Sequence, residues 1–348
     1  MVATDEFLTL GEIRRAAART VPIGPWNYLV GGADTEATLR NNRRALSRYV
    51  FRPRVLRDVS RIDTATTLLD MPLAIPIMVA PMGSTDQVHP DGDLALARAA
   101  GRMGTIQWLT TVSVYTPEEV AAAATGPLVY QLYFRGDNAW GEALIRRVEA
   151  AGFKALCLTV DVPAYGRRER DIEARYNRHA GPKRGVEVPA GYARQASLTW
   201  KDVEWLQRTT VLPLVIKGIA SAEDARLAVE RGVPVVYISN HGGRQLDYAP
   251  APIEVVAEVV DAVAGRAEVV VDGGFTRGTD VLKALALGAR AVCVGKAAAW
   301  GLGAAGEGGV ARVLELLALE LRIAMANTGV ARPSDISRDL VRRACVED

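Results

Sequence analysis

One short stretch of the chain carries residue types that could do acid–base chemistry on an anionic molecule. Residues 235–247 read VVYISNHGGRQLD, so an apolar run is followed by His241, two glycines and Arg244. A histidine can accept a proton near neutral pH, since its ordinary pKa is about 6.5. An arginine presents a planar fork of donors that suits a carboxylate. The spacing therefore predicts a base beside an anion-binding group, although a histidine at a strand end can also serve only to cap a loop.

Polar side chains follow most of the other apolar runs as well. These residues are Gln131, Tyr133, Thr159, Asp161, Arg168, Lys217, Asp272, Arg277 and Lys296. Because catalytic residues of parallel α/β barrels gather at the carboxyl ends of the strands, we expect them to form one site. Asp161 could orient His241 and stabilise its protonated form, as a carboxylate does in a catalytic triad. No serine or cysteine nucleophile accompanies the histidine, and three dispersed histidines do not indicate a metal site.

Two glycine-rich turns predict a binding site for a phosphate group. They are the DGGFTRG stretch at residues 272–278 and the pair Gly295-Lys296. Turns of this kind, after the last strands of an α/β barrel, bind phosphate through backbone N–H groups and helix N-termini. The chain has no G-x-G-x-x-G after its first strand and no G-x-x-x-x-G-K-[ST], which argues against a Rossmann dinucleotide site and a P-loop. Arg168 and Arg244 remain for a second anion, so the pattern indicates a phosphorylated cofactor and an acidic substrate.

The elements that must position these residues alternate along the chain. Apolar, β-rich runs occupy residues 75–83, 105–111, 128–134, 155–163, 213–219, 235–240, 268–274 and 291–296. They are nearly continuous in apolar residues, as expected of strands buried on both faces, and helical stretches separate them. Eight strand–helix pairs are typical of the α/β class and of a (β/α)8 TIM barrel, here a single domain over residues 1–348.

Two further segments lie outside this repeat. Residues 1–74 are expected to contribute N-terminal helices and a lead-in, with Asp34 capping the helix of TEATLRNNRRALSRY. The interval between the fourth and fifth runs is long, and residues 164–198 within it are rich in charge, Gly and Pro. A long polar insertion at the catalytic end of a barrel is interpreted as an active-site lid, and a surface loop is the alternative.

Composition narrows the class of protein. The 348 residues include 42 basic and 40 acidic side chains, a formal net charge of +2, which gives no case for a nucleic-acid partner. Three cysteines show no C-x-x-C spacing, and Cys157 and Cys293 fall in apolar runs, which favours buried thiols in a reducing compartment such as the cytoplasm. The charged, amphipathic N-terminus does not have the pattern of a signal peptide. No apolar run approaches ~18 residues, so no membrane span is expected.

Four blocks of the sequence resemble a known family. SNHGGRQLD, LTVDVPAYGRRERD, KGIASAEDARLA and VDGGFTRGTDVLKALALGA closely resemble the FMN-dependent α-hydroxy acid oxidase/dehydrogenase family, which includes glycolate oxidase, lactate oxidase and mandelate dehydrogenase. The likeness covers nearly the whole chain. It implies an FMN cofactor, a small 2-hydroxy acid substrate and, as in many members, a homotetramer.

The resemblance also implies roles for individual residues. His241 would be the active-site base, with Asp161 as its partner. The substrate carboxylate would be bound by Arg168, Arg244 and Tyr28, and the substrate hydroxyl would face Tyr133. Lys217 would lie at the N1–O2 edge of the flavin and stabilise its reduced, anionic form. The residues implied in FMN binding are Pro81, Met82, Gly83, Thr110, Gln131, Thr159, Lys217, Ser239, Asp272, Gly273, Gly274, Arg277, Gly295 and Lys296.

The chain departs from the family pattern at several positions. Thr276 replaces an arginine on the phosphate side, which leaves Arg277, and Lys296 stands where an arginine is usual. Phosphate binding should survive with fewer paired contacts. Val112 stands where glycolate-oxidase-like members have tryptophan, so the substrate pocket should be wider. Gly83 replaces an alanine found in some oxidases, and the insertion after the fourth strand is shorter than in many members.

The sequence as a whole therefore predicts an FMN enzyme that oxidises a small or aromatic (S)-2-hydroxy acid to the 2-keto acid. The electrons would pass to O2 or to another acceptor, which distinguishes an oxidase from a dehydrogenase. One alternative is a different FMN or nucleotide barrel, such as an isomerase or an IMP-dehydrogenase-like enzyme, which would not need His241 together with Asp161, Arg168 and Arg244. Another is a non-catalytic flavin- or phosphate-binding barrel, which should lack a coherent acid–base set.

Overall fold

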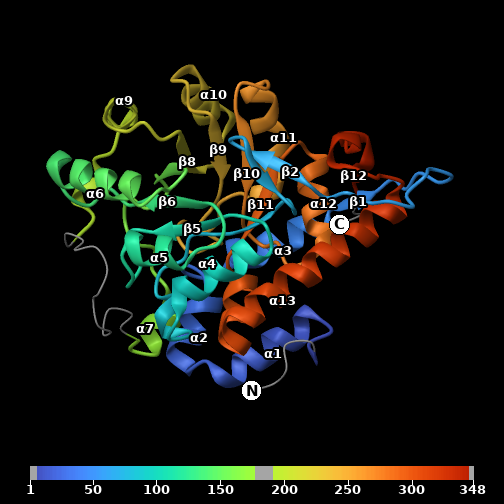
Figure 1. Ribbon diagram of the computed structural model, residues 1–348, viewed down its shortest axis with the longest axis horizontal. Coiled ribbons are helices and arrows are strands. Elements are labelled where there is room, and N and C mark those ends of the chain that lie inside the picture. The colour runs from blue at the N-terminus through green and yellow to red at the C-terminus, as the bar shows by residue number, and fades with distance from the viewer. Residues whose placement is uncertain (1–5, 177–190, 345–348) are drawn as a thin grey trace.

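Eight parallel strands close into a barrel at the centre of the molecule (Figure 1). The computed structural model describes residues 6–176 and 191–344. The barrel strands are β4 (Ile77–Val79), β5 (Gln107–Thr110), β6 (Leu128–Leu132), β7 (Ala155–Thr159), β8 (Leu214–Ile219), β9 (Val235–Ile238), β10 (Glu268–Val271) and β11 (Ala291–Val294). They follow one another around the barrel in chain order, and β11 pairs with β4 to close it. The predicted (β/α)8 barrel is confirmed, and each strand lies within its apolar run.

Helices surround the barrel, because each connection between parallel strands must cross back over the outside of the sheet. They are α4 (Gly92–Arg102), α5 (Pro117–Ala123), α6 (Asn138–Ala150), α9 (Trp200–Thr209), α10 (Ala222–Glu230), α11 (Pro252–Val263), α12 (Gly278–Ala286) and α13 (Lys296–Thr328). The last of these is broken at Ala305 and Gly306, whose backbone angles are not helical. It packs along α1, α4 and α12 (Figure 1).

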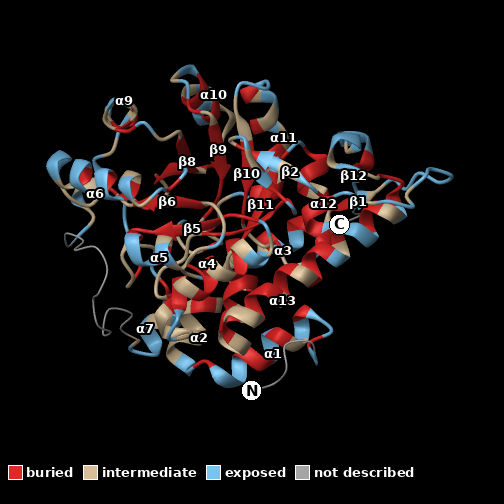
Figure 2. Ribbon diagram, in the orientation of Figure 1, coloured by how far each residue is buried: buried red, intermediate tan, exposed pale blue. Residues whose placement is uncertain are grey.

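The core consists of two clusters of buried residues. Figure 2 shows that the barrel strands and the inner faces of the surrounding helices are buried. Successive side chains of a strand point to opposite faces, so each strand contributes both to the barrel interior and to the layer under the helices. The interior layer includes Trp108 and Tyr237, whose rings meet edge to face. A hairpin of β2 (Thr66–Leu68) and β3 (Met71–Leu73) adds Leu68 and Leu73 to this interior cluster. The N-terminal end of the barrel is thereby filled with apolar side chains.

The N-terminal extension consists of α1 (Leu10–Thr20), α2 (Ile23–Val30) and α3 (Ala37–Ser47). The cap predicted for α3 is wrong: Glu36, in the left-handed region, is the N-cap residue and forms no side-chain capping bond. The N–H groups of Ala37 and Thr38 donate instead to the carboxylate of Asp247, at 3.2 and 2.7 Å. These two bonds fasten α3 to the segment that carries His241.

The remaining elements are short. β1 (Tyr49–Phe51) pairs antiparallel with β12 (Val341–Arg343), and three 3-10 turns cover Thr85–Gln87, Pro333–Asp335 and Arg338–Leu340. The predicted lid contains α7 (Glu169–Glu173) and α8 (Ala193–Ala196), while its residues 177–190 lie outside the described part of the chain. Among the residues described, no helix has the length and apolar character needed to cross a membrane.

Candidate active site

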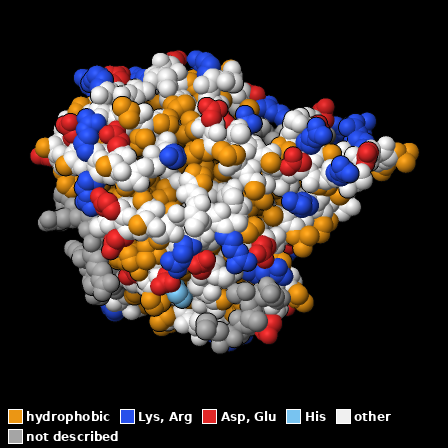
Figure 3. All heavy atoms as spheres, in the orientation of Figure 1, with side chains coloured by type: hydrophobic (Ala, Val, Ile, Leu, Met, Phe, Trp, Pro, Cys, Tyr) orange, Lys and Arg blue, Asp and Glu red, His pale blue; other side chains and the backbone are white. Residues whose placement is uncertain are grey.

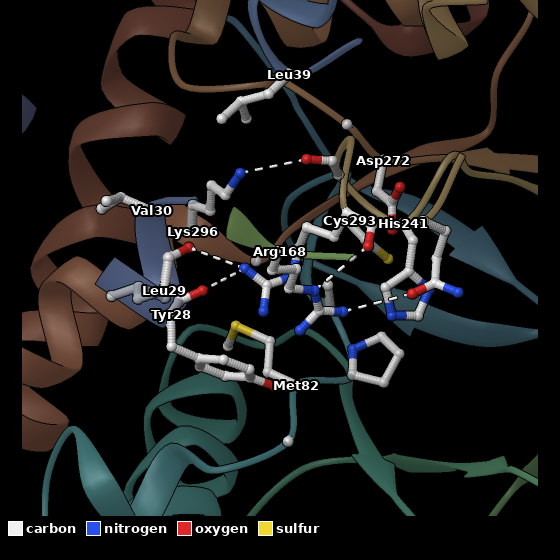
Figure 4. Close-up of a pocket in the computed structure, with 18 of the residues that line it drawn as sticks. Tyr28, Leu29, Val30, Leu39, Met82, Arg168, His241, Asp272, Cys293 and Lys296 are labelled. Atoms are coloured by element: carbon white, nitrogen blue, oxygen red, sulfur yellow. Dashed lines mark hydrogen bonds between the residues drawn. The ribbon is translucent and has the colours of Figure 1, made fainter. Parts of the chain in front are cut away.

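A cavity of 740 Å³ opens at the carboxyl ends of the barrel strands. Its wall includes residues that end or follow strands all around the barrel, together with side chains of α2 and α3. Figure 4 shows Tyr28, Arg168, His241 and Lys296 around this cavity, although they are far apart in the sequence. Several of the polar residues predicted at the strand ends therefore line one cavity.

His241 reaches the cavity because the backbone after β9 turns sharply. His241, Gly242 and Gly243 all have positive φ, at 57°, 67° and 76°. A non-glycine residue adopts this conformation at a cost, and such strain is found most often at functional sites. At Gly243 a Cβ atom would lie 2.7 Å from the backbone of Leu39, so only glycine allows α3 to pack this closely.

The imidazole of His241 is held between two groups. Nδ1 lies 3.2 Å from an Asp161 carboxylate oxygen, and Nε2 lies 3.3 Å from the Tyr133 hydroxyl. Burial lowers the pKa of His241, and Asp161 only partly opposes this effect. Burial works to raise the pKa of Asp161, but His241 and Lys217 outweigh it and the pKa is lowered. The pair therefore consists of a neutral imidazole and a carboxylate, which is the state that can accept a proton.

A second polar cluster lies beneath the histidine. Lys217 donates to Ser239 Oγ at 2.8 Å, and Ser239 in turn donates to Asp272 at 2.7 Å. The backbone N–H of His241 also donates to Ser239 Oγ, at 3.0 Å. Burial disfavours the charge of Lys217, yet the carboxylates of Asp272 and Asp161 raise its pKa above the ordinary value. The barrel therefore holds a buried positive charge at the floor of the cavity.

Two arginines and a tyrosine form a site for a small anion. Arg244 donates to the carbonyl oxygen of Tyr28, and its guanidinium lies 4.5 Å from the centre of the Tyr28 ring. Arg168 is only 4% exposed and donates to the hydroxyl of Tyr165. It also donates to Gln245 Oε1 at 3.4 Å. These bonds fix both guanidinium groups beside His241, where a carboxylate would find two cations.

The phosphate end differs from the prediction at Arg277. Its side chain pairs with Glu320, at 3.0 Å from Nε and 2.9 Å from Nη2, and does not line the cavity. Thr276 and Lys296 line it instead, and Lys296 Nζ donates to the carbonyl oxygen of Gly242 at 3.2 Å. Burial, followed by the charge of Arg244, lowers the pKa of Lys296 well below its ordinary value. A bound anion would oppose that shift, so this lysine suits a phosphate.

Sequence reasoning missed several residues of this wall. Arg14, Arg40 and Arg43 come from the N-terminal helices and line the cavity. Arg43 donates to the carbonyl oxygen of Gly274 at 2.6 Å, so it lies directly at the glycine turn. Their signal in the sequence was arginine repeated on two predicted helices, and such residues usually form a solvated face.

Two buried polar groups near the expected flavin site have no hydrogen-bonding partner among the residues that the structure describes. Gln131 Nε2 and Thr159 Oγ1 are buried, at the ends of β6 and β7, and form no hydrogen bond in the structure. Buried polar groups are nearly always paired, so these two atoms fit a ligand with polar ring edges. Gly83 lines the cavity, and a Cβ atom there would lie 2.8 Å from the Val112 side chain, so a larger residue would require Val112 to shift. The buried Lys217 adds the positive charge that a reduced flavin needs.

The remaining predicted residues are placed as follows. Those lining the cavity are Tyr28, Pro81, Met82, Gly83, Thr110, Tyr133, Arg168, Lys217, His241, Arg244, Asp272, Gly273, Gly274, Gly295 and Lys296. Asp161, Gln131, Thr159 and Ser239 are not part of the lining; Asp161 and Ser239 contact residues that are. Only Arg277 has its side chain turned to another part of the molecule.

The chain is similar in sequence to proteins of a known family. A family model described as FMN-dependent dehydrogenase matches residues 17–343. Glycolate oxidase 5 of Oryza sativa subsp. japonica is 44% identical, over 97% of this chain and 96% of its own length. A peroxisomal (S)-2-hydroxyacid oxidase of Arabidopsis thaliana is also 44% identical, over 97% of both chains.

Two solved structures share the fold of this chain over nearly its whole length. Mandelate oxidase with (S)-2-phenylpropionate has a TM-score of 0.90 and 43% identity, over 98% of this chain and 100% of that one. A mutant of the active chimera of (S)-mandelate dehydrogenase has a TM-score of 0.91 and 33% identity, over 97% of this chain and 99% of that one.

Proposed function

Because this chain belongs to the FMN-dependent dehydrogenase family, we propose that it oxidises an (S)-2-hydroxy acid to the 2-keto acid. The observation that carries the proposal is the position of His241. Its imidazole lies between Tyr133 and Asp161, in a cavity that also holds Arg168 and Arg244. Isomerase-like or non-catalytic flavin barrels would share a phosphate end without needing this set of acid–base and carboxylate-binding groups.

The side chains divide the work between binding and proton transfer. Arg168 and Arg244 bind the carboxylate of the substrate, and Tyr28 lies against both guanidinium groups. The substrate hydroxyl then faces Tyr133 and the Nε2 atom of His241. As the alcohol carbon becomes a carbonyl carbon, His241 takes up a proton, and Asp161 stabilises the imidazolium ion that forms.

FMN, when bound, supplies the acceptor for the two electrons that the alcohol loses. Gln131 and Thr159 would hold the polar edge of its ring system, and Lys217 would place a positive charge beside it. Lys296 and Arg43 would hold the phosphate at the glycine turn. O2 or another acceptor would in turn reoxidise the bound cofactor.

The assembly and the compartment are part of the same proposal. We expect a homotetramer, because the segment after β1 projects from the body and ends in hydrophobic side chains (Figures 1 and 3). Val55 and Leu56 are 80% and 103% exposed there. We expect the enzyme to act in the cytoplasm, which suits the free, buried thiols of Cys157 and Cys293.

An anaerobic titration tests this function directly. The purified holoenzyme is mixed in turn with (S)-lactate, glycolate and (S)-mandelate while its visible flavin spectrum is recorded. Bleaching by at least one acid is the expected result, and admission of air then shows whether O2 restores the bands. A protein that binds no FMN, or a flavoprotein that no 2-hydroxy acid bleaches, would contradict the proposal.

A further inference from the structure

One cation of the cavity, Arg135, has no anion to bind in the function proposed above. Lys296 and the arginines of the N-terminal helices line the cavity with the glycine turns, and we assign them to the phosphate. Arg168 and Arg244 account for the carboxylate of a 2-hydroxy acid. Arg170 also lines the cavity, but it is paired with Glu36 at 2.6 Å. Arg135 lines the cavity too, and it is left over.

The direction of Arg135 follows from the segment after β6. Tyr133 and Arg135 are two residues apart and both line the cavity, as alternate residues of an extended chain do. Phe134, between them, is fully buried on the other side and stacks against Trp205 with ring centres 5.4 Å apart. Arg135 therefore shares the face that carries Tyr133, which is expected to meet the substrate hydroxyl.

Arg135 is also held in place. Its guanidinium lies 4.2 Å from the centre of the Tyr192 ring. Three residues further along, Gln195 is only 3% exposed and accepts a hydrogen bond from the Phe134 N–H at 2.9 Å. The same amide donates to the carbonyl oxygen of Thr159. Gln195 thus joins α8 to the ends of β6 and β7, and this fixes Tyr192 over Arg135.

Within the described part of the chain, no residue forms a hydrogen bond with the Arg135 guanidinium. Its Nε atom is buried and forms no hydrogen bond, and among residues 6–176 and 191–344 no ion pair to a carboxylate involves Arg135. Stacking on a tyrosine occupies the face of the guanidinium and leaves its N–H edge free to donate. A buried N–H group without an acceptor costs free energy, unless a bound ligand supplies the acceptor.

A wall of tyrosines connects this arginine with the carboxylate-binding pair. Arg168 lies 4.1 Å from the centre of the Tyr165 ring, and the Tyr165 and Tyr192 rings are 6.1 Å apart. Val112 and Val162 also line the cavity and add apolar surface. A cation therefore lies at each end of a wall of tyrosine rings and valine side chains.

We propose that Arg135 binds a second carboxylate, carried on the side chain of the substrate, so that the preferred substrates are (S)-2-hydroxy dicarboxylic acids. The proposal rests on the 2-hydroxy acid oxidation proposed above. Arg168 and Arg244 hold the carboxylate next to the reacting carbon, the tyrosines pack against the hydrocarbon spacer, and Arg135 holds the far carboxylate through its free N–H edge. Arg135 touches no reacting atom and determines specificity only.

The test compares two series of substrates of equal chain length. The holoenzyme is assayed by anaerobic flavin reduction with (S)-2-hydroxysuccinate, (S)-2-hydroxyglutarate and (S)-2-hydroxyadipate. Each is compared with the (S)-2-hydroxy monocarboxylate of the same carbon number. We expect kcat/KM for at least one dicarboxylate to exceed that of its partner by about tenfold or more. In Arg135→Met this ratio should fall toward one, and in Arg135→Lys part of it should return.

A binding measurement and a matched control separate specificity from folding. The Kd of 2-oxoglutarate, the product expected from (S)-2-hydroxyglutarate, is followed by the shift of the flavin spectrum. It should rise in Arg135→Met, while the Kd of 2-oxopentanoate, the monocarboxylate of the same length, changes much less. Arg146→Gln, which alters an exposed arginine of α6, should keep both the ratio and the Kd values. Monocarboxylates that reduce the flavin as well as dicarboxylates at every length would show that Arg135 does not bind a second carboxylate. The same conclusion would follow if Arg135→Met kept the ratio, and in both cases the proposed function would stand. If no acid of either series reduces the flavin, the proposed function itself fails.

Discussion

Burial and charge act in opposite directions on the imidazole of His241. Burial lowers its pKa from the ordinary 6.5, whereas the carboxylate of Asp161 raises it. Burial prevails, so the imidazole is neutral and ready to accept a proton at pH 7. Protonation should therefore abolish activity only below pH 6.5, and kcat/KM should decline on the acid side of that value.

Replacing Asp161 by Asn should move this acid limb in a defined direction. The substitution removes the main influence that raises the pKa of His241, while burial and the positive charge of Lys217 remain. The acid limb of kcat/KM should thus shift to lower pH. The rate of flavin reduction should fall by ~100-fold or more, because the imidazolium ion loses its stabilising carboxylate.

The pH profile of flavin reduction in stopped flow measures both effects. Asp70→Asn, at the exposed turn between β2 and β3, is the matched control and should behave as the wild type. An acid limb that moves to higher pH in Asp161→Asn would show that Asp161 does not act on His241 through its charge.

The sequence predicted the residues at strand ends better than those on the loops. His241, Asp161 and Lys217 each follow or end an apolar run, and strand direction alone brings them to one face. Tyr165 and Tyr192 lie in the insertion, where no periodicity indicates which side chains face inward. The side-chain direction of Arg277 was not predictable either, because its partner Glu320 lies in another helix.

At the scale of elements, the N-terminus of α3 is capped by a residue far away in the chain. The carboxylate of Asp247 accepts from the N–H groups of Ala37 and Thr38 and from the hydroxyl of Thr35. These bonds satisfy helix N–H groups that would otherwise lack a partner, and they lower the pKa of Asp247 to about 2 in spite of desolvation, which acts to raise it. The sequence predicted the helix from its spacing but could not reveal a cap supplied from outside it.

Replacing Asp247 by Ala should therefore destabilise the protein by about 1–2 kcal/mol at pH 7. The folded-state pKa lies below the ordinary 3.8. The contribution of the charge is thus fully present above that value and is lost as the pH falls from there toward about 2. Urea unfolding at pH 7 and at pH 3 should show a smaller difference between Asp247→Ala and the wild type at the lower pH.

The control is Asp261→Ala, which removes an exposed carboxylate paired with Arg338. It should change the free energy of unfolding by less than about 1 kcal/mol. A loss in Asp247→Ala that is no larger than in this control would mean that α3 is held by packing alone. Because α3 also carries Arg40 and Arg43 to the cavity, the affinity for FMN should weaken together with the cap.

At the scale of the molecule, a closed barrel leaves few places for association. Closure removes the strand edges, and the helices cover the outer face of the sheet. The barrel was predictable because its eight apolar runs repeat regularly. The segment between β1 and β2 was not, since it has no such pattern, yet it carries the apolar side chains of Val55 and Leu56 into solvent.

Exposure of this degree is unusual for two neighbouring apolar residues, and Leu56 is also held at a φ of 56°. If the proposed homotetramer forms through this projection, Val55→Asp with Leu56→Asp should convert it to smaller species, because each new charge would be buried at the contact. Light scattering during gel filtration measures the mass. Val211→Asp, which changes a valine that is 87% exposed elsewhere, should leave the mass unchanged. A double variant that keeps the mass of the wild type would place the contact on another surface, and a wild-type monomer would refute the assembly altogether.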